Sequence, residues 1–206
     1  MRFIKKIPLE NKEKTKELLS SGWHKLKEPR NASIAILCSL PLSLILMAVN
    51  GMWLYFISTG LRNFMQLDDF TIEFQITIKS LIIFILAVIL FLFIHEIIHA
   101  LFIPNIVHST CTYWGFNGLF GFVYTEEIIK KRRFLLISIM PLLILSFLLP
   151  VVLSFLGISN WLAIFISVLN AGGSCADILN IILIMAQVPS NGEIINNGFS
   201  TYYKTV

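Results

Sequence analysis

Residues 80–103 read SLIIFILAVILFLFIHEIIHALFI, and this stretch decides the fold class. The apolar run is longer than the roughly 20 residues that a helix needs to cross the hydrocarbon core of a membrane. A single segment can satisfy its own backbone hydrogen bonds in lipid only as a helix. We therefore predict a transmembrane helix, with His95, Glu96 and His99 in its C-terminal part.

The run His95-Glu96-Ile97-Ile98-His99 indicates the chemistry. Two histidines four residues apart face the same side of a helix and can bind one zinc ion, and the glutamate between them can act as a general base. So short a pattern also arises by chance, and polar residues in a span can simply hydrogen-bond to neighbouring helices. Ionisable side chains at membrane depth cost about 2.5–3.5 kcal/mol each on insertion scales, however, so their clustering favours a metal site.

The composition of the whole chain excludes an ordinary soluble domain. Of its 206 residues, 56% are hydrophobic and only 14% are charged, whereas soluble domains are typically about 45–50% apolar. Four stretches are long enough to cross a membrane: 33–58, 80–103, 134–157 and 161–187. We predict an all-α integral membrane protein with four transmembrane helices.

The distribution of lysine and arginine predicts the topology. Residues 1–33 hold nine of the sixteen, and residues 130–133 are all basic. Because positively charged loops stay in the cytosol, both termini are expected to be cytosolic. The predicted organisation is a basic cytosolic segment at 1–32, a four-helix domain at 33–187 and a cytosolic C-terminal tail at 188–206.

The N-terminal segment has two interpretations. It does not resemble a cleavable signal, because its charged stretch is long and no short apolar core with a cleavage site follows. Residues 9–27 suit a short helix on the anionic membrane surface, and a loosely ordered charged tail is equally compatible. Since the net charge of +4 comes largely from this segment, it indicates membrane topology, and no nucleic-acid partner is expected.

A catalytic zinc site usually has a third protein ligand. Depth in the membrane favours Asp177: at about 1.5 Å per residue it lies roughly 24 Å below the start of its span, and His95 and His99 lie roughly 21 and 27 Å below the start of theirs. Small residues at 170–174 precede Asp177 and would allow two helices to approach closely. The other candidates are His108, Cys175, Glu126 and Glu127.

A β-hairpin is expected at about 110–125, directly after the motif helix. Two strand-like runs flank Asn117-Gly118, which is the strongest short hairpin signal. Such a hairpin, with Tyr113 and Trp114, could bind an extended substrate segment by strand addition. An aromatic belt at the membrane interface is the alternative interpretation.

The chain resembles the bacterial family of putative zincin peptidases in four features. These are the run FIHEIIHA at residues 93–100, an aromatic loop after it, a span with an early proline at Pro141, and a last span with small residues before Asp177. More distantly, they look like the site-2 protease type of intramembrane metalloprotease. The resemblance covers roughly residues 80–187. It implies His95, His99 and Asp177 as ligands of one zinc ion per chain and Glu96 as the catalytic base.

The chain departs from the better-studied site-2 proteases around the aspartate. Those proteins have an Asn-Pro-Asp-Gly or Leu-Asp-Gly signature, whereas residues 175–178 here read CADI. The sequence around Asp177 therefore matches the site-2 protease motif less well than the sequence around the histidines does. Either Asn170 or Asn180 could stabilise the oxyanion.

These observations predict a zinc-dependent, membrane-embedded endopeptidase that cleaves membrane-associated proteins or peptides near the cytosolic face. The expected location is a bacterial cytoplasmic membrane, with several spans in the lipid bilayer. The alternative is a non-catalytic metal-binding or scaffold membrane protein derived from a protease. Retention of Glu96 favours the enzyme.

Overall fold

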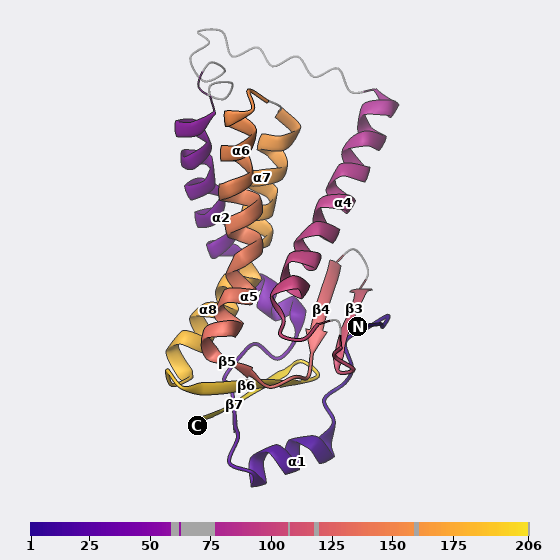
Figure 1. Cartoon of the computed structure of the whole chain (residues 1–206), viewed down its shortest axis with the longest axis vertical. Coiled ribbons are helices and arrows are strands. Elements are labelled where there is room, and N and C mark those ends of the chain that lie inside the picture. The colour runs from indigo at the N-terminus through magenta and orange to yellow at the C-terminus, as the bar shows by residue number, and fades with distance from the viewer. Residues whose placement is uncertain (59–61, 63–76, 107, 118–119, 159–160, 206) are drawn as a thin grey trace.

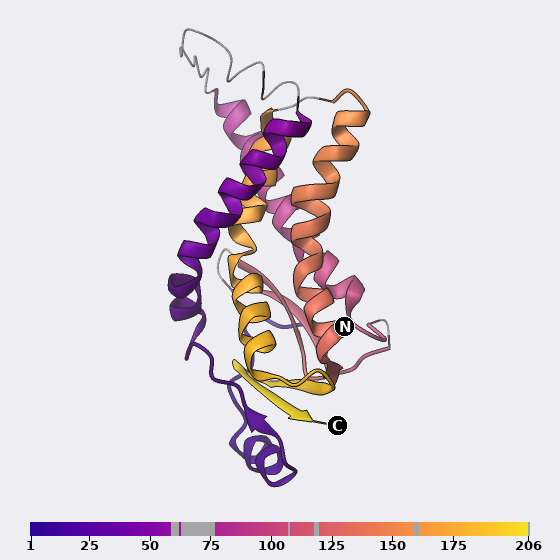
Figure 2. The ribbon, with the colours of Figure 1, turned by 90° about the vertical axis from the view of Figure 1, so that its left-hand side faces the viewer.

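Helices at one end and two small sheets at the other make up the molecule (Figure 1). The computed structural model describes residues 1–58, 62, 77–106, 108–117, 120–158 and 161–205. Both ends of the chain lie at the sheet end in the two perpendicular views (Figures 1 and 2).

Four helical segments within the described residues are long and apolar enough to cross a membrane. Each agrees with its predicted bounds to within three residues. The first span is α2 (Ala32–Ile57), and the second is α4 (Ile78–Phe102). The third is α5 (Lys131–Pro141), a π-helix η1 (Leu142–Leu148) and α6 (Leu149–Phe155), and the fourth is α7 (Trp161–Gly173) followed by α8 (Cys175–Gln187).

Local sequence explains where the first two spans begin. The side chain of Asn31 accepts a hydrogen bond from the Ile34 N–H, and Thr77 and Ser80 form a reciprocal capping box before α4. Such side chains satisfy N–H groups that have no partner inside the helix. α4 ends at Phe102, just before Pro104, which cannot continue a helix hydrogen-bond ladder.

The four spans do not pack as one uniform bundle. α2 contacts α7 and α8, whereas α4 packs mainly against α5 and strand β4 (Phe120–Thr125). At Gly172 a Cβ atom would lie 2.9 Å from Met47 Sδ and 3.0 Å from Ser43 Oγ, so α7 lies very close to α2 there. Among the small residues before Asp177, Gly172 therefore allows a close approach to the first span.

Strand β3 (Thr112–Asn117) pairs with β4 in antiparallel fashion, which confirms the predicted hairpin. Asn117 pairs with Phe120, and Gly118 lies outside the described residues. A short N-terminal strand, β1 (Arg2–Phe3), runs parallel to β3 on its other side. The strand order β1-β3-β4 leaves β4 at one edge of this sheet.

The prediction of an all-α protein was wrong, because a second sheet lies beside the first. Its order is β2 (His24–Lys25), β7 (Ser200–Thr205), β6 (Gly192–Asn197) and β5 (Ile129–Lys130). The residues expected to form a C-terminal tail supply its central hairpin. Asn197-Gly198 is the same dipeptide as Asn117-Gly118, and Gly198 has φ of +63°, a conformation that glycine adopts without strain. That signal could have revealed the hairpin.

Two buried clusters join the second sheet to the rest of the chain. Helix α1 (Lys12–Ser20) contributes Leu18, which packs with Trp23, Ile195 and Tyr202. A second cluster joins α8 to the sheet through Ile184, Val188 and Ile194, together with Leu26. The helix that carries Asp177 is thus anchored directly on this sheet.

Glu10 ties the N-terminal segment to the same sheet. Its carboxylate accepts hydrogen bonds from the hydroxyls of Tyr202 and Ser200 and from the Lys25 ammonium. The hydrogen bond from Tyr202, followed by that from Lys25, lowers the pKa of Glu10 from 4.5 to about 2. Residues 1–32 are therefore built into the fold and do not form a loose tail.

Candidate metal centre

The motif helix places both histidines on one face. His95 and His99 lie one turn apart on α4, and their ring centroids are 4.9 Å apart. Their side chains are only 12% and 13% exposed. The arrangement predicted from the spacing of four residues is therefore present.

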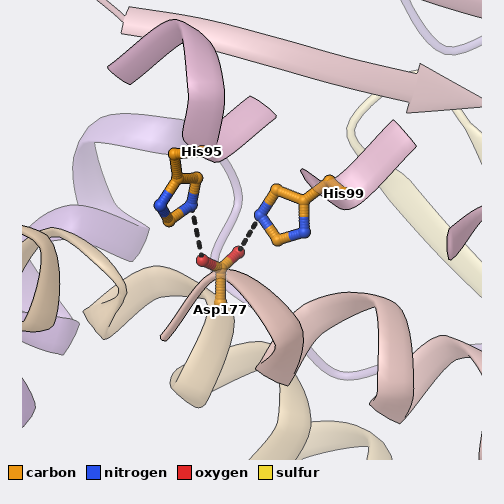
Figure 3. Close-up of side chains that lie close together, drawn as sticks. All are labelled: His95, His99 and Asp177. Atoms are coloured by element: carbon orange, nitrogen blue, oxygen red, sulfur yellow. Dashed lines mark ion pairs between the residues drawn. The ribbon is translucent and has the colours of Figure 1, made fainter. Parts of the chain in front are cut away.

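Asp177 comes from the first turn of α8, just after the fourth span is interrupted at Ser174. One carboxylate oxygen lies 3.3 Å from His95 Nε2, and the other lies 3.4 Å from His99 Nε2 (Figure 3). Within the described residues, these three side chains form the one group of histidine, cysteine or acidic side chains arranged to hold a metal ion. Their ligand atoms all lie within 4.8 Å of one another.

The two distances between histidine and aspartate fit a zinc ion. Two ligands about 2.05 Å from a tetrahedral zinc lie about 3.3 Å from each other. The observed 3.3 and 3.4 Å match this separation and exceed the range of about 2.7–3.2 Å for a direct N–H···O hydrogen bond. Two imidazoles and a carboxylate also form a common donor set for catalytic zinc, in which a fourth position stays open.

The other nitrogen of each histidine has a hydrogen-bond acceptor. His95 Nδ1 lies 2.8 Å from Asn170 Oδ1, and His99 Nδ1 lies 2.9 Å from the Ile137 carbonyl oxygen. The acceptors come from α7 and α5. Both rings are thus held from two sides, with Nε2 directed at Asp177.

Glu96 lies beside the ligands but is not one of them. It faces β4, where a Cβ atom on Gly121 would lie 2.8 Å from Glu96 Cγ. Any larger residue at position 121 would displace the glutamate or the strand. Gly121 was not singled out in the sequence, and only its contact with the motif helix reveals its role.

The hairpin beside Glu96 is anchored to the second sheet. The Tyr124 hydroxyl accepts a hydrogen bond from the Gly198 N–H and donates one to Glu126. Burial raises the pKa of Tyr124, so this hydroxyl stays protonated and keeps its role as a donor. Asn196 also donates to the Thr125 carbonyl. These contacts fix the base of β4 relative to the helix that carries Asp177.

The residues predicted to bind substrate have defined places on the hairpin. Tyr113 stacks on Tyr124, with ring centroids 6.1 Å apart. Trp114 packs edge-on against Phe3 of β1 and Phe93 of α4. Asn117 is the last residue of β3. β1 pairs with Tyr113 and Trp114 of β3, whereas β4 lies at an edge of the sheet along its whole length.

The alternative third ligands lie outside the group. His108 is exposed, and Cys175 is buried with its sulfur accepting a hydrogen bond from Ser39. Glu126 pairs with Lys14 at 2.6 Å, and Glu127 accepts a hydrogen bond from Ser109. Asp177 is the candidate that the structure brings to the histidines.

The two asparagines considered for the oxyanion differ in their surroundings. Asn180 is exposed on α8. Asn170 is buried, and its amide group donates to Ser146 Oγ at 2.8 Å and to the Pro141 carbonyl at 3.3 Å while its oxygen faces His95. Ser146, which holds Asn170, and Ile137, which contacts His99, were missed in the sequence. Pro141 was the one available signal.

The region that contains this site matches a known family. A family model described as "Putative zincin peptidase" matches residues 88–192, just over half of the chain. The matched region contains the HEIIH motif, the hairpin, the third span and Asp177. No curated protein and no solved structure matches the chain.

Proposed function

Because the chain belongs to the family of putative zincin peptidases, we propose that it is a zinc-dependent endopeptidase embedded in a membrane. The observation that carries the proposal is the convergence of His95 Nε2, His99 Nε2 and Asp177, at distances that fit zinc, beside a glutamate that is not a ligand. His95, His99 and Asp177 would hold the ion. Bound there, zinc would polarise the scissile carbonyl and lower the pKa of a coordinated water toward about 7.

Glu96 is the group that moves the proton. It accepts a proton from the attacking water and donates it to the leaving amine, the ordinary work of a general base that then becomes a general acid. Gly121 of β4 packs against this side chain, since a Cβ atom there would lie 2.8 Å from Glu96 Cγ. The hairpin therefore keeps the carboxylate close to the ligands.

The edge of β4 suggests how a substrate is presented. A peptide can be cut only when its backbone is extended, and pairing with an exposed strand edge holds it so. β4 lies at the end of its sheet and contacts the motif helix next to Glu96. We assign the substrate to this edge of β4. The aromatic side chains of Tyr113 and Trp114 belong to β3, the other strand of the hairpin.

The membrane setting follows from the four spans and the positive charge at the sheet end. Lysine and arginine are concentrated in residues 1–33 and 130–133, both of which lie at that end. Under the positive-inside rule, the sheets and the metal centre face the cytosol. The substrates would be membrane-anchored proteins or peptides whose cleavage site reaches the cytosolic side of a bacterial cytoplasmic membrane.

The test is zinc content and proteolysis of the detergent-purified chain. Wild type and Glu96→Ala should each contain about one zinc per chain, whereas His95→Ala and Asp177→Ala should lose it. Wild type should cleave fluorescently labelled casein, and the variants should not. Wild type that binds no zinc would overturn the proposal. Wild type that binds zinc but cleaves neither casein nor a library of membrane-anchored peptides would favour the non-catalytic scaffold.

A further inference from the structure

The third span is interrupted where it passes the metal centre. Pro141 ends α5, and the π-helix η1 follows at once. Proline has no N–H, so the carbonyl four residues earlier loses its helix partner. That residue is Ile137, and its carbonyl oxygen is the one that lies 2.9 Å from His99 Nδ1.

The contact with Ile137 decides which nitrogen of His99 carries the proton. A carbonyl oxygen only accepts hydrogen bonds, so Nδ1 must be the donor. The neutral ring then has its lone pair on Nε2, which lies 3.4 Å from Asp177 Oδ1. The free carbonyl at Ile137 therefore selects the form of His99 that can bind a metal.

His95 receives the same support through Asn170. The Asn170 amide nitrogen lies 3.3 Å from the Pro141 carbonyl and 2.8 Å from Ser146 Oγ. Because the carbonyl can only accept, the amide nitrogen must face it, and the amide oxygen must face His95. That oxygen lies 2.8 Å from His95 Nδ1 and accepts its proton.

The π-helix supplies the serine that holds this asparagine. In η1 the hydrogen bonds join residues five apart, as from the Leu149 N–H to the Ile144 carbonyl. Ser146 is fully buried within it, and its own carbonyl accepts a hydrogen bond from Asn50 of α2. Neighbouring polar side chains thus form hydrogen bonds with Ser146 in the irregular segment. This is typical of a functional irregularity and not of a packing defect.

We propose that the proline break in the third span supports the metal centre: Pro141 frees the Ile137 carbonyl for His99, and the adjoining π-helix holds Asn170 for His95. Both histidines then present Nε2 to one ion. Pro141 and Asn170 are positioning residues, since neither touches the ion. The inference rests on the proposed zinc site and adds what orients its ligands.

The first test is Pro141→Ala, with zinc affinity measured by competition with a chromogenic chelator. Alanine restores an N–H that can close the helix bond to Ile137 and compete with His99. Loss of such supporting contacts typically weakens metal binding about 10–100-fold, and we expect a decrease in that range. Pro41→Ala is the matched control: it is the same change inside another span, α2, where the carbonyl four residues earlier belongs to the exposed residue Leu37, and we expect zinc affinity to be unchanged.

Asn170 provides a second test that does not depend on the proline. Asn170→Ala removes the acceptor for His95 and should weaken zinc binding about 10-fold or more. Asn170→Asp keeps an oxygen facing the ring and should recover most of the affinity. A purely structural role predicts the opposite order, because a buried carboxylate beside the Pro141 carbonyl would disturb the packing at least as much as alanine.

The outcomes separate this inference from the proposed function. Weaker binding in Pro141→Ala or, if that variant does not fold, in Asn170→Ala with recovery in Asn170→Asp supports the inference. Wild-type affinity in folded Pro141→Ala, or no recovery in Asn170→Asp, overturns it and leaves the zinc peptidase proposal standing. Wild type without zinc affinity overturns both.

Discussion

The second and third spans contribute to the metal centre in different ways. α4 is an unbroken helix, and its side chains His95, Glu96 and His99 face the site. The third span places no ligand side chain there. It contributes backbone oxygens at Ile137 and Pro141, and the Ile137 oxygen is available because Pro141 has no N–H to bond to it. A regular helix thus presents side chains, whereas a broken one can also present its backbone.

Side chains at the start of the third span also contact the two ligand-bearing helices. α4 packs against α5 over its C-terminal part, where the histidines lie, and Arg133 at the start of α5 donates to the Phe102 carbonyl at the end of α4. Lys131 likewise donates to the Val188 carbonyl at the end of α8. The start of the third span therefore contacts the ends of both ligand-bearing helices.

The largest expected effect is that of replacing Glu96, the proposed general base on α4. Glu96→Gln keeps the size of the residue but removes the base. General acid–base catalysis typically contributes 10²–10⁴-fold, so casein cleavage should fall by about that factor. Zinc content should stay at the wild-type level, as measured by elemental analysis. Loss of zinc in this variant would mean that Glu96 is a ligand, and the division of roles along α4 would be wrong.

Gly121→Ala tests whether β4 positions that base. The new Cβ would lie 2.8 Å from Glu96 Cγ, so one of the two must move. Displacement of a catalytic group by about 1 Å can cost about 10²-fold in rate. We expect kcat/KM for casein to fall about 10–100-fold with zinc affinity unchanged. Gly51→Ala is the control, because a Cβ there meets nothing within 4 Å, and its activity should equal that of wild type.

Side-chain chemistry on regular helices could be predicted from the sequence. The apolar runs define the four spans, and the spacing of His95 and His99 places both on one face. The depth argument selected Asp177, which the structure brings to the histidines. These inferences succeed because helix geometry converts residue number into direction and depth.

Contacts that depend on backbone irregularity could not be predicted in the same way. Pro141 signals an interruption, but not which side chain takes the freed carbonyl of Ile137. In the second sheet, Asn197-Gly198 could have signalled the β6–β7 hairpin, but β2 and β5 are two-residue strands from distant parts of the chain and carry no such signal. Only tertiary packing brings such segments together.

Ser146→Ala tests whether the hydrogen bond between Ser146 and Asn170 contributes to zinc affinity. Ser146 accepts a hydrogen bond from Asn170, one step further from the histidine. The Asn170 amide keeps its second acceptor, the Pro141 carbonyl, so the loss should be partial. We expect zinc affinity to fall about 3-fold, less than the 10-fold or more for Asn170→Ala. Ser154→Ala, in the same span but bonded to the Ile57 carbonyl of α2, should leave the affinity unchanged.

Arg133→Gln should have the smallest effect, because it alters only the contact between the ends of the two spans. The Arg133 Nε donates to the Phe102 carbonyl at 2.6 Å, and a positive charge stabilises the C-terminal end of a helix dipole by about 0.3–1 kcal/mol. We expect the thermal midpoint to fall by about 1–4 °C. Arg132→Gln removes the same charge from an exposed neighbour and should change the midpoint less. Equal shifts in the two variants would show that the hydrogen bond from Arg133 to the Phe102 carbonyl adds no stability beyond the charge itself. A larger shift for Arg133 would show that the basic cluster at 130–133 also holds the motif helix against the third span, so its residues serve both topology and the geometry of the metal centre.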